Sequence, residues 1–134
     1  MTSCVSPKLE IEEPYVKYVK IFEEESIRFG NPTLIRDLTI KTVSNLGKGT
    51  ICGVCIPLTI HPRILISHKF WKNYSDPERE QLMLHEISHC VLKRKHNSKL
   101  DEYGFPVSIM YPNMLSIRLY TSNRSYYLKE LFSK

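Results

Sequence analysis

The segment 81–96 carries three histidines, at positions 85, 89 and 96. Residues four apart on an α-helix lie on the same face, so His85 and His89 can offer imidazole nitrogens to one ion. Zinc accepts such nitrogens at about 2.0–2.1 Å. Glu86 follows His85 directly and would flank the ion without binding it, as suits a carboxylate that takes a proton from metal-bound water. The segment therefore predicts a helix that carries a metal site.

A catalytic zinc site needs a third protein ligand, and His96 is the candidate. On a continuous helix His96 would lie roughly 10 Å along the axis from His89, too far to share an ion. The helix must therefore end near 92–94, and the chain must turn back. No glycine lies between the two histidines, and Asn97 is the nearest residue that tolerates a left-handed conformation.

Two acidic residues follow the motif closely, and either offers an alternative to His96. Asp101 or Glu102 could be the third ligand, or could accept a hydrogen bond that orients an imidazole. We favour His96, because zinc in such sites commonly takes three histidines.

The start of the helix is indicated by Ser75-Asp76-Pro77-Glu78. Ser75 and Glu78 fit a capping box, and Asp76 as the cap would instead put Pro77 at the first helical position. Both alternatives begin the helix near residue 76 and extend it to about 93. Its buried face is expected to contain Leu82, Ile87 and Val91, with Leu84 or Leu92.

These residues resemble the long motif of the metzincin zinc metallopeptidases, His-Glu-x-x-His-x-x-Gly-x-x-His followed by a tight turn that carries Met. Ser108-Ile109-Met110-Tyr111-Pro112 is similar to that turn, most of all in the matrixin branch. Two positions differ: Leu92 replaces the glycine, and the third histidine comes at 96 instead of 95. Segment 64–112 is more similar to small predicted metallopeptidases, many from phages and bacteria, with His-Glu-x-x-His-Cys-x-Leu-x-Arg-x-His.

The resemblance implies one zinc ion per chain, held by His85, His89 and His96, with Glu86 as the catalytic base. It implies that Met110 forms an apolar floor beneath the metal. Tyr111 is interpreted as structural, because it stands one residue after the methionine and not two.

The resemblance also implies where a peptide or protein substrate would bind. In such enzymes the strand before the active-site helix lies at the sheet edge and pairs with extended substrate. We therefore expect substrate contacts around Ile64, Leu65 and Ile66, within a strand predicted over 63–70.

Two other functions fit the same residues. One is a zinc hydrolase that acts on a non-protein amide, such as a cell-wall peptide. The other is a zinc-containing structural or interaction protein of a larger assembly, with little turnover. The presence of Glu86 argues against the structural role, since a purely structural zinc site does not need that carboxylate.

The remaining pattern predicts a single α+β domain over 1–134. We expect a small twisted mixed sheet of three or four strands, a backing helix and the active-site helix, as in a minimal metzincin-like (zincin) domain. Residues 1–13 are predicted to be a flexible lead-in. The predicted elements are a helix over 14–29, strands over 38–43 and 50–58, and a final helix over 122–134.

Four cysteines are present, and two of them form Cys52-Gly-Val-Cys55. This spacing occurs in redox pairs and in halves of structural zinc sites. Cys4 and Cys90 do not supply the second close pair that a four-cysteine zinc site needs. We therefore favour buried free thiols and predict no disulfide, as in a reducing compartment.

Composition limits the other possibilities. The net charge is +5, and the basic residues are scattered, so we do not expect nucleic-acid binding. No apolar run approaches the ~20 residues of a membrane span, and the first residues do not resemble a secretory signal. We therefore expect a cytoplasmic protein with no membrane partner, although packaging in a phage particle would leave no such mark. The oligomeric state is not indicated.

Overall fold

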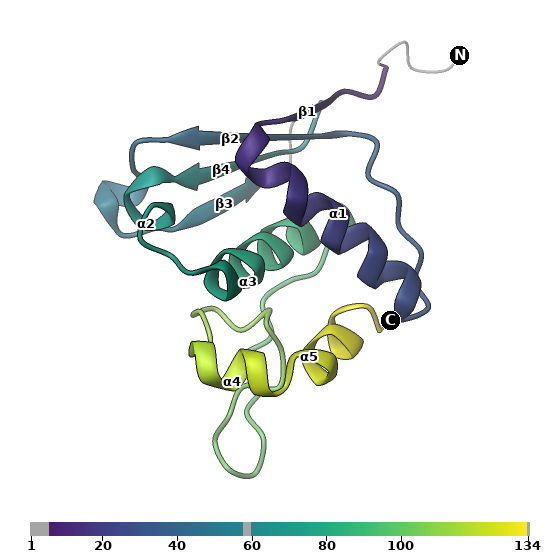
Figure 1. Cartoon of the computed structure of the whole chain (residues 1–134), viewed down its shortest axis with the longest axis vertical. Helices are drawn as coiled ribbons and strands as arrows, with labels where there is room; N and C mark the ends of the chain where they lie inside the picture. Colours follow the sequence, from purple (N-terminus) through teal and green to yellow (C-terminus); the bar gives the residue numbers. More distant parts are fainter. Residues whose placement is uncertain (1–5, 58–59, 134) are drawn as a thin grey trace.

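The computed structural model describes residues 6–57 and 60–133 and has an α+β fold with a four-stranded mixed sheet (Figure 1). The strands are β1 (Leu9–Ile11), β2 (Leu38–Val43), β3 (Gly53–Ile56) and β4 (Arg63–Ser67). Their order across the sheet is β1-β2-β4-β3. Strands β1, β2 and β4 run parallel to one another, and β3 is antiparallel to β4. Strand β3 is therefore an edge strand with one side open.

The helices lie on one side of this sheet (Figure 1). They are α1 (Glu13–Arg28), α2 (His68–Trp71), α3 (Asp76–Ile87), α4 (Ile117–Ser122) and α5 (Arg124–Leu131). Helix α3 continues as a π-helical turn over Ser88–Leu92, which matches the end expected from the sequence. The α+β class, the first helix, the strand over 38–43 and the motif helix are thus confirmed. Among the described residues, no helix is long and apolar enough to cross a membrane.

The core fills the space between the sheet and the helices. Alternate residues of β2 and β4 face it, and Ile40, Ile64 and Ile66 are fully buried. Trp71 packs edge-on against Tyr15 and Tyr18 of α1, with ring centroids 4.9 and 5.6 Å apart. This contact joins α1 to α2, which precedes α3 in the chain.

The first strand corrects the expectation of a flexible lead-in. Residues 9–11 pair in parallel with β2, and the backbone amide of Leu38 donates to the carbonyl of Lys8 at 2.8 Å. Parallel neighbours need a crossover connection, which α1 supplies. Residues 1–5 of the expected lead-in lie outside the described residues.

The position of β4 corrects the expectation of an edge strand around Ile64, Leu65 and Ile66. Strand β4 lies between β2 and β3, and it ends at Ser67, after which α2 begins. Its near-continuous apolar run is typical of an interior strand. The open edge belongs instead to β3, which is shorter than the predicted strand over 50–58; residues 58 and 59 lie outside the described residues.

Cys55 and Cys90 form a disulfide, so the prediction of free thiols was wrong for this pair. The two residues lie on β3 and on the π-helical turn, and folding brings together cysteines 35 positions apart. Cys52 remains a free thiol, with its sulfur 2.9 Å from the Tyr74 hydroxyl. The bridge therefore ties the open edge strand directly to the helix that carries the histidines.

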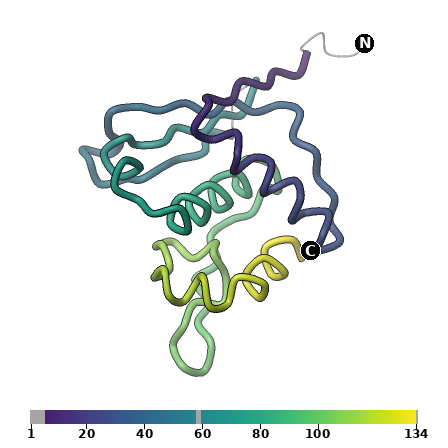
Figure 2. Tube along the Cα trace, in the orientation of Figure 1, coloured from purple at the N-terminus to yellow at the C-terminus, as the bar shows by residue number. Residues whose placement is uncertain are grey.

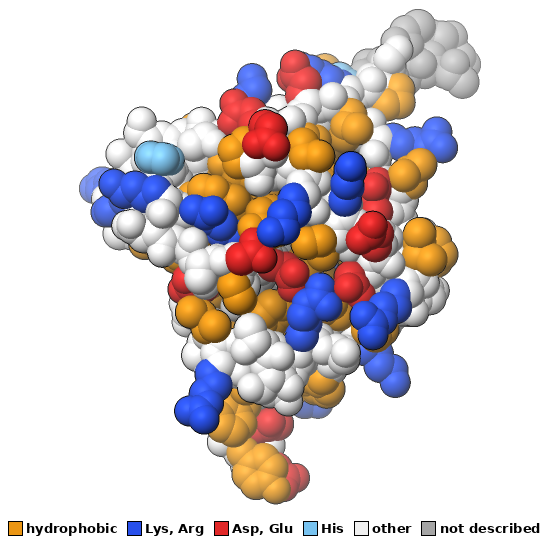
Figure 3. Space-filling model, viewed as in Figure 1, with side chains coloured by type: hydrophobic (Ala, Val, Ile, Leu, Met, Phe, Trp, Pro, Cys, Tyr) orange, Lys and Arg blue, Asp and Glu red, His pale blue; other side chains and the backbone are white. Residues whose placement is uncertain are grey.

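Charged side chains of both signs are interspersed over the face shown in Figure 3. The excess of basic residues therefore does not gather into one patch on that face. Figure 2 shows the chain path, in which the segment after α3 turns back along that helix before it reaches α4 and α5.

Replacing both bridged cysteines, Cys55→Ala with Cys90→Ala, should lower the free energy of unfolding by about 4 kcal/mol, because the unfolded chain loses a cross-link across a long loop. Urea denaturation would measure this loss, and a reducing agent should cause a similar loss in the wild type. Cys52→Ala is the matched control, and it should stay within about 1 kcal/mol of the wild type. Equal stability of the double variant and the wild type would contradict the assigned bridge.

Candidate metal centre

The helix α3 begins with the capping box expected from the sequence. The backbone amide and the hydroxyl of Ser75 both donate to Oε1 of Glu78, at 2.8 and 3.0 Å. Pro77 occupies the first turn. These contacts fix where the helix starts, and therefore which of its residues face the sheet.

The chain reverses immediately after the π-helical turn. Lys93 adopts a left-handed conformation, with φ 59°, and the amide of Arg94 donates to the carbonyl of Ser88 at 3.1 Å. Lys93 also donates from Nζ to the Cys90 carbonyl at 3.0 Å. The chain reversal that brings His96 back toward the other histidines is therefore made at Lys93. It is not made at Asn97, although asparagine tolerates a left-handed conformation better than lysine does. Local contacts offset the strain of a non-glycine residue there.

Two backbone carbonyls orient His85 on α3 and His89 on the π-helical turn. Nδ1 of His85 donates to the Ile109 carbonyl, and Nδ1 of His89 donates to the Arg94 carbonyl, both at 2.6 Å. A carbonyl oxygen can only accept, so in each neutral ring the proton lies on Nδ1 and the lone pair on Nε2. The two Nε2 atoms are 3.2 Å apart. Two ligands at typical Zn–N distances with this separation would subtend about 100° at the ion, close to tetrahedral.

His96 completes the group. Its ring centroid lies 5.3 Å from that of His85 and 4.9 Å from that of His89. One ligand atom from each of the three rings lies within 4.8 Å of the others, so the three residues could hold a metal ion. The structure therefore brings together the three predicted ligands.

The acidic alternatives to His96 lie elsewhere. The carboxylate of Asp101 accepts from the amides of Tyr103 and Phe105, at 2.8 and 3.0 Å, and shapes an exposed loop. Glu102 is exposed in the same loop. Neither residue belongs to the candidate ligand group found among the described residues.

The segment Ser108–Tyr111 forms the tight turn suggested by the sequence. The Tyr111 amide donates to the Ser108 carbonyl at 3.1 Å, and the Met110 amide donates to the Ser108 hydroxyl oxygen at 2.9 Å. Met110 is fully buried, and its carbonyl accepts from the amide of Asn97 at 2.9 Å. The turn therefore orients His85 through one carbonyl and holds the chain beside His96 through the next. Tyr111 is partly buried against the core, in agreement with a structural role.

Glu86 lies between the histidines and β3. Its carboxylate is 3.9 Å from Nε2 of His85, and its side chain is 8% exposed. Burial raises the pKa of this carboxyl group from 4.5 to about 7, although the Cys55 amide, which donates to it, opposes the shift. A Cβ added at Gly53 would lie 3.0 Å from Cδ1 of Ile66, a tight contact, and 3.5 Å from Cγ of Glu86, an ordinary one. Burial likewise lowers the pKa of His85, from 6.5 to about 4, which keeps the imidazole neutral and able to bind a metal.

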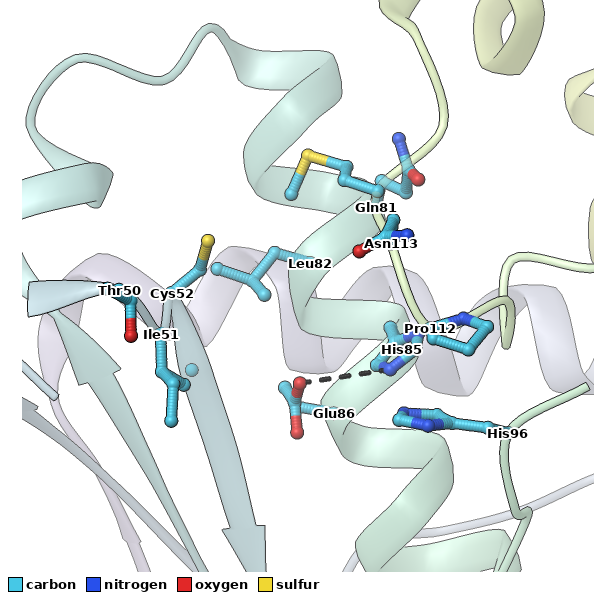
Figure 4. A pocket seen from close by; sticks show the side chains of 12 residues that line it. Thr50, Ile51, Cys52, Gln81, Leu82, His85, Glu86, His96, Pro112 and Asn113 are labelled. Atoms are coloured by element: carbon cyan, nitrogen blue, oxygen red, sulfur yellow. Dashed lines mark ion pairs between the residues drawn. The ribbon is translucent and has the colours of Figure 1, made fainter. Parts of the chain in front are cut away.

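Two hollows flank this centre along β3. The first, of about 310 Å³, is shown in Figure 4, where His85, Glu86 and His96 lie at one end. Its other lining residues are neutral, namely Thr50, Ile51, Cys52, Gly53, Gln81, Leu82, Pro112, Asn113 and Met114. The second, of about 640 Å³, lies between β3 and the segment 93–96. Together they form a groove that passes the three histidines and follows the open edge of β3.

Some features of the site could not be found by motif reasoning. The carbonyls of Ile109 and Arg94 and the amide of Cys55 are backbone groups, which carry no side-chain signature in the sequence. Cys90 did carry a signal, since it directly follows His89, but its partner on β3 depends on the tertiary fold. His68, the other histidine near the motif, is exposed on α2 and does not belong to the group.

The protein purified without added metal should contain one equivalent of metal, and His96→Ala should bind it roughly 100-fold more weakly or worse. Loss of an outer-shell partner already costs 10–100-fold in affinity, and this change removes a ligand. Mass spectrometry of the metal content and chelator competition would measure both. His68→Ala is the matched control and should retain the metal. Full retention by His96→Ala would remove His96 from the ligand group.

Glu86→Gln should stabilise the metal-free protein at pH 8, by as much as about 3 kcal/mol, and the gain should disappear by pH 4. The folded-state pKa of Glu86 lies above the unfolded value, so its ionisation costs stability as the pH rises from about 4.5 through 7. Urea denaturation in the presence of a chelator across this pH range would measure the difference. Glu102→Gln, which removes a carboxylate from an exposed loop, is the matched control. A pH-independent difference for Glu86→Gln would contradict the raised pKa.

No family model, no curated protein and no solved structure matches this chain. The assignment of a candidate metal centre therefore depends on the geometry of His85, His89 and His96, the neighbouring Glu86, and the carbonyls that orient the rings.

Proposed function

We propose that this protein is a zinc-dependent peptidase in which Glu86 is the general base. One observation carries the proposal: the converging Nε2 atoms of His85 and His89, 3.2 Å apart, lie beside a buried carboxylate that no cation neutralises among the described residues. Structural zinc sites use four protein ligands, whereas catalytic sites use three and leave a position open. Three histidines and an adjacent carboxylate fit the catalytic arrangement.

Zinc is the metal that the donor set favours. Neutral imidazoles suit zinc among several transition metals, whereas magnesium and calcium prefer oxygen ligands. Among the described residues the group offers nitrogen ligands from His85, His89 and His96. A zinc ion at this place would supply Lewis acidity, which polarises a carbonyl oxygen and makes water easier to deprotonate.

The roles of the protein groups follow from their positions. Glu86 would accept a proton from the attacking water and then donate it to the nitrogen of the leaving amine. The C–N bond breaks as the nitrogen takes this proton. Burial raises the pKa of Glu86 in the metal-free protein, which makes this carboxylate a stronger base than an exposed one. The Cys55 amide orients the carboxylate, and the Ile109 and Arg94 carbonyls fix the rings of His85 and His89 so that their Nε2 atoms would hold the ion.

An extended peptide would bind along β3, and not along β4 as the sequence suggested. Ser67 donates from its amide to the Cys52 carbonyl at 2.8 Å, and hydrogen-bonded pairs alternate in an antiparallel ladder. The backbone groups of Gly53 and Cys55 therefore point to the open edge. The Cys55 amide already donates to Glu86, so the groups of Gly53 and the Cys55 carbonyl are the ones with which a substrate strand could pair. Such a strand would pass the histidines within the groove.

The two alternative functions, a hydrolase of a non-protein amide and a structural zinc protein, would use different features of this site. A hydrolase of another amide would use the same chemistry but would not need the β3 edge. A structural zinc protein would have no use for Glu86, whose burial raises its pKa and so disfavours its charged form. Natural proteins accept such costs mainly at functional sites. We therefore favour the peptidase.

Glu86→Gln should retain the metal and lose peptide hydrolysis by a factor of roughly 10²–10⁴, the usual contribution of a general base. Cleavage of a mixed, end-blocked peptide library by the zinc-loaded protein, followed by mass spectrometry, would measure this. Glu102→Gln is the matched control and should cleave like the wild type. Equal turnover by Glu86→Gln would exclude this carboxylate as the base, and no turnover by the wild type would favour one of the two alternatives.

A further inference from the structure

The two hollows on either side of the metal centre differ in charge. The neutral hollow of about 310 Å³ has no lysine, arginine or acidic residue in its wall apart from Glu86. The larger hollow, of about 640 Å³, is lined by Lys93, Arg94 and Lys95. Among the described residues that line it, the buried Glu86 is again the only acidic one. We call this larger hollow the basic hollow.

The three cations of the basic hollow are not equivalent. The positive charge of Arg94 is compensated by Glu130, because the guanidinium donates to Oε2 of that residue at 2.9 Å. The same guanidinium also donates to the Leu131 carbonyl at 2.9 Å. Lys93 donates to the Cys90 carbonyl, which leaves its charge uncompensated. Lys95 is exposed, and among the described residues it has no ion pair. Two lysines therefore contribute net positive charge to the groove.

The opposite wall of the basic hollow consists of Gly53, Val54 and Cys55 of β3 and of Pro57, which directly follows that strand. A β-strand rises about 3.3 Å per residue, so a peptide paired with β3 would place roughly four of its residues along this wall. A peptide on the β3 edge would thus carry about four residues past Lys93 and Lys95 on one side of the cleaved bond. On the other side it would meet only the neutral hollow.

We propose that this protein selects peptides with a carboxylate within about four residues of the cleaved bond, on the side that faces Lys93 and Lys95. This inference rests on the proposed peptidase function and specifies its substrate class. The carboxylate could belong to an Asp or Glu side chain or to the end of the peptide. Charge complementarity at a cleft both attracts the correct peptide and excludes peptides with lysine or arginine at the same place.

The experiment uses the zinc-loaded protein and blocked octapeptides of alternating Thr and Val, with Glu, Gln or Lys placed at one position at a time. We expect Glu to be preferred over Lys roughly three- to tenfold in kcat/KM, on one side of the cleaved bond only, as for one or two partly exposed ion pairs. Lys95→Glu should reduce or reverse this preference. Lys41→Glu, an exposed change on β2 outside both hollows, should leave it intact. A peptide with a free carboxyl end and no Glu distinguishes a terminal carboxylate from a side chain.

The outcomes separate this inference from the proposed function. Cleavage without an acidic preference, or a preference that Lys95→Glu leaves unchanged, overturns the inference while the peptidase function stands. If the wild type cleaves no peptide, binding of the Glu and Lys octapeptides to zinc-loaded Glu86→Gln, measured by fluorescence anisotropy, decides the question. Tighter binding of the Glu peptide, lost in Glu86→Gln with Lys95→Glu, supports the basic hollow, and equal binding overturns it.

Discussion

The site depends on two backbone carbonyls that fix the protons of two histidine rings. Because Ile109 and Arg94 each accept from an Nδ1 atom, the lone pairs of His85 and His89 face each other across 3.2 Å. Two such lone pairs repel unless a cation lies between them. The fold maintains this arrangement because the carbonyls belong to two separate reversals of the chain. The two rings therefore present converging lone pairs that could receive a cation.

The same two reversals account for much of the surrounding structure. The turn over 108–111 contributes Ile109 and also holds the segment beside His96, while the left-handed Lys93 returns the chain to α3. The segments beyond the turn are then anchored to α3. Gln81 exchanges hydrogen bonds with the backbone of Leu115, at 3.2 and 2.6 Å. Glu80 accepts from Tyr120 and Arg124, both at 2.6 Å. These buried polar contacts hold the C-terminal helices against the helix that carries the ligands.

Sequence reasoning succeeded where the signal was local and periodic. The capped α3, the stop after Leu92 and the approach of His96 to His85 and His89 all followed from helix geometry and from the demands of a shared ion. It failed where partners are far apart in the chain. Strand β4 was expected at the edge because it directly precedes the motif helix, but β3 folds back against it and takes the edge. The Cys55–Cys90 bridge and the strand at 9–11 were missed for the same reason.

The sequence by itself determined which side chains could serve as ligands and base, because the spacing of His85, Glu86 and His89 on a helix is set by its period. It also required the chain to turn back before His96. Only the tertiary structure decided which nitrogen of each ring is free, which strand borders the groove and how strongly Glu86 is desolvated. Those properties depend on backbone groups and on burial by distant segments, and neither is encoded at any single position of the sequence.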